Sequence, residues 1–306
     1  MITSWNVNQF LRTRNWTEFD EEALKKSGKS DEEIQEIRRE KENIQNECSK
    51  EIKCLIKKRY AAKEQDLIFL HEVPNDLAWK IQENVNRWLD LNDNKYECLL
   101  PYKTAPKTHF QTLAIFMEGK YEYNETYTNN VEIKFAFNGT GFRNRILALN
   151  PKNKKSEIIC GVHVPPDEKE CPVYYESLIG LHNKFKEAKA KTIYYIGDFN
   201  AFLPNKINKR KMHDLMALGL EDYWLATGNS NNSPTHLFGE RIDYVLAYRN
   251  SRFKNLEDYQ KYFNKYEMTV DPKDIADKGN RKESLLSDHS AIILKERTPE
   301  MKKTGD

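Results

Sequence analysis

Polar residues that could bind a cation or move a proton recur at the ends of apolar stretches in this sequence. The run YYIGDFN ends in Asp198 and Asn200, and residues two apart in a strand point to the same face. Comparable positions follow five other apolar runs. The complete set comprises Asn6, Asn8, Glu72, His163, Asp198, Asn200, Asp243, Asp288 and His289. Strand ends are where α/β folds commonly keep their chemistry, so we expect these side chains to share one site.

The residue types in this set favour a site for a hard divalent cation with acid–base partners. Glu72, Asp198 and Asp288 supply carboxylates, and amide and histidine side chains accompany them. Each residue alone has a simpler interpretation, because a lone acid at a strand end usually caps a turn and a lone histidine usually belongs to the core. Burying acids at several strand ends costs free energy unless they are paired or bind metal. The recurrence therefore favours a common metal site.

These strand ends need a β-rich scaffold to position them. Apolar runs predict strands at 1–7, 66–74, 96–102, 112–118, 131–137, 142–150, 156–166, 192–200, 241–248 and 285–294. Helices are predicted at 30–59, 75–91, 174–190 and 207–218, with a further charged, helical stretch at 255–283. The alternation predicts a single α+β domain over 1–306, a four-layer sandwich of two packed, mostly antiparallel β-sheets flanked by helices. Residues 17–63 and 255–283 are interpreted as insertions into it.

The first insertion carries one long amphipathic helix. Ser30 and Glu33 have the spacing of a capping box, and apolar residues follow at intervals of three, four and seven between Ile34 and Leu55. An apolar helix face needs a partner. We expect the 30–59 helix to dock on the body of the protein, or else to mediate self-association or contact with another protein chain.

Composition excludes several classes of protein. Lysine and arginine (49) nearly balance aspartate and glutamate (47), so no overall field indicates a nucleic-acid or membrane partner. The start MITSWNVNQF lacks the features of a signal peptide, and no apolar run is long enough to span a membrane. Five cysteines without a CxxC pair fit neither a disulfide framework nor a zinc site. We expect a soluble, cytoplasmic protein with reduced thiols and no membrane partner.

Six short motifs, in order, resemble those of the endonuclease/exonuclease/phosphatase superfamily, which has the fold of pancreatic deoxyribonuclease. They are SWNVN, FLHEV, GVHVPP, IGDFNA, RIDYVL and LSDHSAI, and they extend from residue 4 to residue 292. Each motif is weak alone, but their order makes the resemblance specific. The chain departs from compact members in its two insertions, and it has His163 where abasic-site endonucleases usually have tyrosine. That difference favours the deoxyribonuclease-like and phosphatase-like branches.

The resemblance implies a role for each matched residue. Asn6 and Glu72 would hold Mg²⁺ or Mn²⁺, with Asp288 near or on the metal. Asp198 and Asn200 would position the attacking water and the phosphate, and Asp243 would orient His289 as the general base. His163 would bind the phosphate or protonate the leaving oxygen. Asn8 and Arg145 would bind substrate phosphate. The spacing of Arg143 and Arg145 separately predicts that both lie on one face of a strand, and the alternative for Arg145 is a solvated strand arginine.

The reaction implied is metal-dependent hydrolysis of a phosphate ester. A phosphodiester repels hydroxide, so its hydrolysis needs a cation on the phosphate, a base for water and a stabilised leaving group. A nuclease acting on DNA or RNA is the first interpretation, with local basic patches drawn from Lys103, Lys107, Lys206, Lys209, Arg210 and Lys211. A phosphatase or phosphodiesterase for small molecules or lipid headgroups shares the same site. An inactive binding module is the third interpretation.

Overall fold

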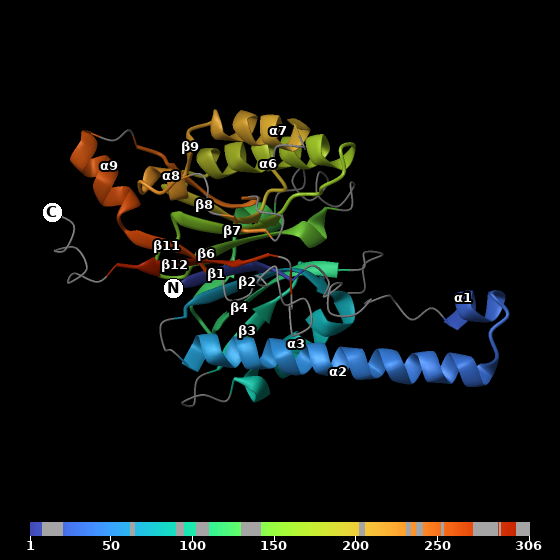
Figure 1. Cartoon of the computed structure of the whole chain (residues 1–306). Coiled ribbons are helices and arrows are strands. Elements are labelled where there is room, and N and C mark those ends of the chain that lie inside the picture. The colour runs from blue at the N-terminus through green and yellow to red at the C-terminus, as the bar shows by residue number, and fades with distance from the viewer. Residues whose placement is uncertain are drawn as a thin grey trace.

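The computed structural model describes residues 1–7, 21–61, 65–89, 95–101, 110–129, 142–201, 206–230, 234–236, 241–251, 254–271, 287 and 289–297. Within these ranges, the strands form two six-stranded sheets that stack face to face (Figure 1). The first sheet has the order β11-β12-β1-β2-β4-β3 and the second the order β5-β6-β7-β8-β10-β9. The predicted sandwich of two mostly antiparallel sheets is confirmed.

Each sheet has one parallel pair of strands at its centre. In the first sheet β1 (Ile2–Asn6) runs parallel to β2 (Leu67–Pro74), and in the second β7 (Glu157–His163) runs parallel to β8 (Thr192–Asp198). The remaining pairs in both sheets are antiparallel. Parallel strands end at the same edge, so each sheet brings two carboxyl ends together at its middle.

The flanking strands complete both sheets. They are β3 (Tyr96–Leu99), β4 (Phe110–Met117), β5 (Tyr121–Tyr123), β6 (Ile146–Pro151), β9 (Leu220–Asp222), β10 (Asp243–Arg249), β11 (Tyr266–Asp271) and β12 (Ala291–Glu296). Because β10 pairs antiparallel with β8, its first residue Asp243 lies opposite Asp198. The start of β12 likewise lies beside the end of β1.

Three apolar layers hold the sandwich together. Leu67, Phe69 and Ile196 belong to the layer between the sheets, and the other two layers lie between each sheet and its helices. The close approach of the sheets depends on Gly161, because a Cβ at this position would lie 2.4 Å from Cδ1 of Phe69 in the opposite sheet. Burial of apolar residues on both faces of each sheet provides the main stabilisation.

Helices cover the two outer faces (Figure 1). Helices α6 (Glu170–Glu187) and α7 (Lys206–Met216) cover the second sheet, and α2 (Asp31–Ala61) and α3 (Asn75–Trp88) cover the first. The short helices are α1 (Glu21–Lys26), α4 (Glu125–Asn129), α8 (Tyr223–Ala226) and α9 (Leu256–Phe263). The sequence did not indicate α4, α8, β5 or β9, whose three to five residues are too short for a periodic pattern.

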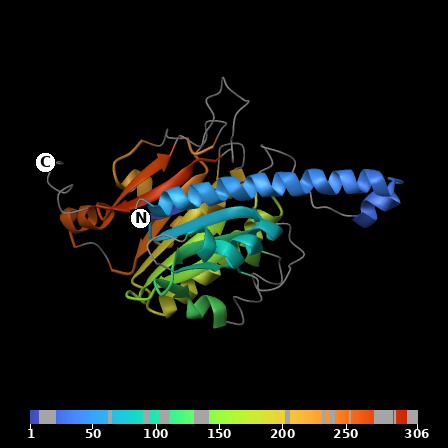
Figure 2. The ribbon, with the colours of Figure 1, turned by 90° about the horizontal axis from the view of Figure 1, so that it is seen from below.

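The predicted long helix is present as α2, but only its carboxyl-terminal half docks on the body. Ile52, Ile56 and Tyr60 are buried in the core layer against the first sheet. Figures 1 and 2 show the amino-terminal half extending past the body, with α1 beside its end. The predicted capping box forms, since the Glu33 amide donates to Ser30 Oγ and the Ser30 amide donates to Glu33 Oε2.

Two local predictions were wrong. The 255–283 stretch is not continuously helical: α9 ends at Phe263, and β11 then forms the edge of the first sheet beside β12. Tyr266 and Met268 are buried between the sheets, so the period-two alternation of YEMTVD outweighs its charged surroundings. Arg143 and Arg145 do not share a strand face, because Arg143–Arg145 forms a 3₁₀ turn and β6 begins only at Ile146.

The 3₁₀ turn has identifiable hydrogen bonds that hold it outside the sheet. The buried side chain of Asn144 donates to the Phe110 carbonyl at 2.9 Å, and the Arg145 amide donates to the Phe142 carbonyl. The predicted strand at 131–137 lies outside the described residues. Cys54, Cys98, Cys160 and Cys171 form no disulfide. Among the described helices, none is both long and apolar enough to cross a membrane.

Candidate active site

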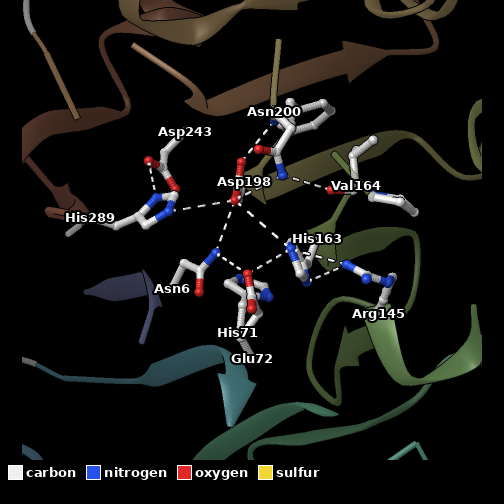
Figure 3. Close-up of polar contacts among 12 residues, drawn as sticks. Asn6, His71, Glu72, Arg145, His163, Val164, Asp198, Asn200, Asp243 and His289 are labelled. Carbon is white, nitrogen blue, oxygen red and sulfur yellow. Dashed lines mark hydrogen bonds and ion pairs between the residues drawn. The ribbon is translucent and has the colours of Figure 1, made fainter. Parts of the chain in front are cut away.

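The ends of the two central strand pairs meet at one end of the sandwich. Asn6 ends β1 and Glu72 lies near the end of β2, while His163 and Asp198 end β7 and β8. His163 and Asp198 are register partners in the second sheet. Stacking of the sheets then brings these four polar side chains together from four strands (Figure 3).

Glu72 reaches the site through an irregularity in β2. Leu70 pairs with Leu113 and Val73 pairs with Gln111, so His71 and Glu72 together oppose Thr112 as in a β-bulge. Glu72 has φ of 54°, which is uncommon for a residue other than glycine or asparagine. Regular alternation would turn Glu72 to the outer, helix-covered face. The bulge turns it to the strand end instead, and such backbone strain is typical of functional sites.

Asp198 is the centre of the cluster. It is only 1% exposed, and its Oδ2 accepts a hydrogen bond from Asn6 Nδ2 at 2.9 Å. The same Asn6 nitrogen donates to Glu72 Oε1 at 3.0 Å, so one amide links the carboxylates of the two sheets. The backbone amide of Asn200 donates to Asp198 Oδ1 at 2.8 Å, and Asn200 Nδ2 donates to Oδ2 at 3.1 Å. Four hydrogen bonds therefore fix the Asp198 and Glu72 carboxylates.

Asn200 is itself held in a left-handed turn just after β8. Its φ is 47°, a conformation that asparagine tolerates better than most residues. Asn200 Nδ2 donates to the Val164 carbonyl at 2.8 Å, and the buried Asn208 of α7 donates to the Asn200 carbonyl at 3.0 Å. Helix α7 therefore begins beside the site and is tied to it.

His289 and Asp243 form an imidazole–carboxylate pair on the opposite side of Asp198 from His163 (Figure 3). His289 Nδ1 lies 3.0 Å from Asp243 Oδ2, and Nε2 lies 3.8 Å from Asp198 Oδ2. The His289 amide donates to Ser287 Oγ, and Thr235 Oγ1 accepts from the Asp243 amide at 3.0 Å. With Nδ1 directed to Asp243, Nε2 is the nitrogen that faces the site.

His163 lies between the Glu72 carboxylate and Arg145. Its Nε2 lies 3.0 Å from Glu72 Oε1, and Arg145 Nη1 lies 2.9 Å from Nδ1. Burial lowers the pKa of His163 to about 4, although Glu72 opposes this shift. His163 is therefore neutral at pH 7, and Nδ1 accepts from Arg145 while Nε2–H donates to Glu72. Arg145 also lies over the Phe110 ring, 4.7 Å from its centroid.

Burial has the opposite effect on Asp198. It raises the pKa of the Asp198 carboxyl to about 7, the neighbouring His289 lowers it, and Asp243 raises it. A buried carboxylate close to Glu72 and Asp243 is costly without a compensating positive charge.

The residues present fit a hard divalent cation. Ligand atoms of Glu72, His163 and Asp198 lie within 4.8 Å of one another, and so do those of Asp198, Asp243 and His289. Carboxylate and amide oxygens are the ligands that Mg²⁺ and Mn²⁺ prefer. A cation would also offset the repulsion among the buried carboxylates.

The structure brings together eight of the residues singled out from the sequence: Asn6, Glu72, Arg145, His163, Asp198, Asn200, Asp243 and His289. Asn8 and Asp288 lie outside the described residues.

Sequence reasoning missed His71, Asn208 and His236. His236 is paired with His289 in an isolated β-bridge, and their ring centroids are 5.0 Å apart. The position of His71 next to Glu72 was a usable signal, whereas nothing local distinguished Asn208.

The comparison with solved structures gives the fold independent support. A humanized D. rerio TDP2 carrying 14 mutations is 13% identical, with 97% of this chain and 98% of the other covered and a TM-score of 0.53. D. rerio TDP2 complexed with a single-strand DNA product is 13% identical at the same coverage, with a TM-score of 0.52. An AP endonuclease from Archaeoglobus fulgidus is 12% identical, with 97% and 99% covered and a TM-score of 0.53.

These likenesses are structural and lie far below the identity at which sequences alone reveal kinship. No family model and no curated protein matches the sequence. The structural match covers 97% of this chain in both comparisons. The chain thus has the four-layer, deoxyribonuclease-like sandwich fold.

Proposed function

We propose that this protein is a divalent-metal-dependent phosphodiester hydrolase that acts on nucleic acid. The observation that carries the proposal is the position of the Asp198 carboxylate. It accepts from Asn6, which also binds Glu72, and on its other side it faces Nε2 of the His289–Asp243 pair. Residues that can bind a cation therefore lie on one side of a buried carboxylate, and a base lies on its other side.

Glu72 and Asn6 would hold the cation, with Asp288 as a further ligand. When bound, the Mg²⁺ or Mn²⁺ ion would withdraw charge from a non-bridging phosphate oxygen. Glu72 provides the carboxylate ligand, and the Nε2–H of neutral His163 fixes the orientation of that carboxylate. The left-handed backbone of Glu72 at the strand end supports this role.

His289 would be the general base. Its Nε2 would take a proton from a water molecule that Asp198 orients through Oδ2, and Asp243 would stabilise the imidazolium that forms. Asn200 holds Asp198 through two hydrogen bonds, so it acts on the orientation of the water and the phosphate.

Arg145 and His163 would bind the phosphate on the opposite side. The Arg145 guanidinium contacts His163 and the Phe110 ring, which hold it at the site. A neutral His163 can donate one hydrogen bond but carries no additional proton for a leaving oxygen. This favours the phosphate-binding role of His163 over the role of general acid.

Two observations support nucleic acid as the substrate. The exposed Lys209 and Arg210 are on α7, next to Asn208, which binds the Asn200 carbonyl at the site. One of the similar structures is a complex with a single-strand DNA product. Lys103 and Lys107 lie outside the described residues. A phosphatase or phosphodiesterase for small molecules or lipid headgroups would use the same catalytic residues, and it is the alternative that the test must distinguish.

A substrate screen tests the proposal. The protein is incubated with Mg²⁺ or Mn²⁺ and plasmid DNA, single-stranded DNA, RNA, or phosphorylated sugars and inositols. We expect cleavage of at least one polynucleotide, steep inhibition by added salt, loss of activity on chelation, and little release of inorganic phosphate. Glu72→Gln is the inactive control. Rapid phosphate release from small substrates with intact DNA and RNA would replace the nuclease assignment with a phosphatase.

A further inference from the structure

A fully buried histidine lies directly beneath the proposed metal site. His71 precedes Glu72 in β2 and has no exposed surface. Its Nε2 lies 2.9 Å from Ser4 Oγ in β1, and its Nδ1 lies 3.2 Å from Thr112 Oγ1 in β4. The ring therefore connects the strands on both sides of β2, on the face that meets the second sheet. None of the catalytic roles described above uses it.

The same ring lies where the two sheets approach each other at the site. Gly197, one residue before Asp198, has φ of 145°, and a Cβ there would lie 2.9 Å from His71 Nε2. The strand of the second sheet that ends in Asp198 thus passes directly over the imidazole. In the first sheet, the register partner of His71 is Asn6, whose side chain joins Glu72 to Asp198.

His71 also fixes the bulge that directs Glu72. His71 and Glu72 together oppose Thr112, and Thr112 is the residue whose hydroxyl contacts the imidazole. Before the bulge, Phe69 faces the second sheet and Leu70 faces the helices; after it, Val73 faces the helices. With His71 held toward the second sheet, the additional residue is Glu72, which is turned to the strand end.

We propose that His71 is a positioning residue, which, through Ser4, Thr112 and the Gly197 backbone, sets the separation and orientation of Glu72 and Asp198 for the cation. The inference rests on the proposed metal-dependent function. His71 itself touches neither substrate nor metal. It acts through Glu72, the next residue in the first sheet, and through Gly197, which precedes Asp198 in the second sheet.

His182 provides a matched control for a purely structural histidine. It is equally buried, lies in α6, and its Nδ1 is 3.2 Å from the Tyr195 hydroxyl. Its surroundings include the Tyr248 ring, 4.8 Å away between centroids, and no residue of the proposed site. Replacing His182 should therefore change stability without changing the metal site.

The test compares His71→Phe, His71→Gln and His182→Phe in the full chain. Phenylalanine keeps a ring but loses the hydrogen bonds, whereas glutamine keeps a donor and an acceptor. Two quantities are measured: the free energy of unfolding in urea, and the Kd for Mn²⁺ alone from the EPR signal of free Mn²⁺. We expect both phenylalanine variants to be destabilised. Only His71→Phe should bind Mn²⁺ more weakly, by about 10–100-fold, as for other residues that orient metal ligands.

The glutamine variant should recover most of the Mn²⁺ affinity, and saturating Mn²⁺ should restore kcat in His71→Phe. If His71→Phe does not fold, Ser4→Ala and Thr112→Val each remove one contact of the ring and should weaken Mn²⁺ binding in the same direction. Wild-type Mn²⁺ affinity in the folded His71 variants would overturn the inference, as would an equal loss in His182→Phe. If the wild type binds Mn²⁺ and His71→Phe binds it more weakly, but the wild type cleaves no phosphodiester, only the proposed function is overturned. A wild-type protein that does not bind Mn²⁺ overturns both.

Discussion

His289 and Asp243 are joined by a 3.0 Å contact between Nδ1 and Oδ2, and this contact leaves Nε2 of the same imidazole directed toward Asp198. The two residues come from different sheets: His289 lies two residues before β12, and Asp243 is the first residue of β10. Thr235 accepts from the Asp243 backbone and Ser287 from the His289 backbone, and the Ser290 amide donates to the Thr235 carbonyl, so the backbones of the two partners are also linked. Such a preorganised pair is suited to taking a proton from water.

The pair should behave as one unit in mutant kinetics. His289→Ala or Asp243→Ala should each lower kcat by about 10²–10⁴-fold, because each removes the general base in its working orientation. The double variant should lose little more than the worse single variant. Single-turnover rates at saturating metal measure this. Losses that simply multiply would show that the two residues act separately.

Removing the Glu72 carboxylate should affect metal binding more than folding. Glu72→Gln keeps the size of the side chain and its contact with Asn6, but it removes the charge offered to the cation. We expect weaker Mn²⁺ binding, most of the activity lost, and an unfolding free energy within about 1 kcal/mol of wild type. The control is Glu122→Gln on β5, away from the strand ends that form the proposed site. Full activity of the wild type after exhaustive chelation would contradict the metal-dependent mechanism.

Gly197 should not tolerate a side chain. A Cβ at this position would lie 2.0 Å from the Val162 carbonyl oxygen, and φ of 145° adds backbone strain. We expect Gly197→Ala to cost about 3 kcal/mol or more, measured by urea unfolding. Gly180→Ala is the matched control, because this glycine is inside α6 with no atom within 4 Å of an added Cβ. That change should stabilise the helix by about 0.5–1 kcal/mol.

Stability should fall on acidification partly because of His182. Burial lowers the pKa of His182 to about 4 from its ordinary 6.5, so the imidazole is neutral in the fold. Below pH 6.5 the His182 imidazole binds a proton in the unfolded chain but stays neutral in the folded protein. Stability is therefore lost as the pH falls toward 4. This single group should cost wild type about 2 kcal/mol between pH 7 and pH 5.

The difference between wild type and His182→Gln isolates this contribution. Glutamine does not titrate, so the stability gap between the two proteins should narrow or reverse as the pH falls from 7 to 5. Urea unfolding at both values measures it. A gap that does not change with pH would show that His182 accepts its proton in the folded protein.

Helix α2 should divide into a half that supports the fold and a half that does not. Ile52 is fully buried against the first sheet, whereas Ile37 lies half-buried in the projecting half. Ile52→Ala should therefore cost about 2–5 kcal/mol and Ile37→Ala much less. Sedimentation of both variants and wild type tests whether the projecting half mediates self-association. A changed mass for Ile37→Ala with unchanged stability would assign this half to an interface.

Local sequence patterns were sufficient to predict the central strands and the polar residues at their ends. An apolar run bounded by a polar residue is a local pattern, so β1, β2, β7, β8 and β10 were predictable with Asn6, Glu72, His163, Asp198 and Asp243 at or near one end of each strand. The capping box of α2 was equally local, since Ser30 and Glu33 are three residues apart. The order of the motifs carried the resemblance that indicated the fold.

How these strand ends meet depends on tertiary packing. Alternation alone would have placed Glu72 under the helices. It is redirected by a bulge at His71 and Glu72, where the His71 ring contacts Ser4 and Thr112 on the neighbouring strands. β11 forms because β12 offers hydrogen bonds and the inter-sheet core accepts Tyr266 and Met268. Arg145 reaches His163 from a turn that the Asn144 side chain holds against Phe110. Each outcome depends on partners distant in the sequence, and a pattern read along the chain contains no information about which surfaces will pack together.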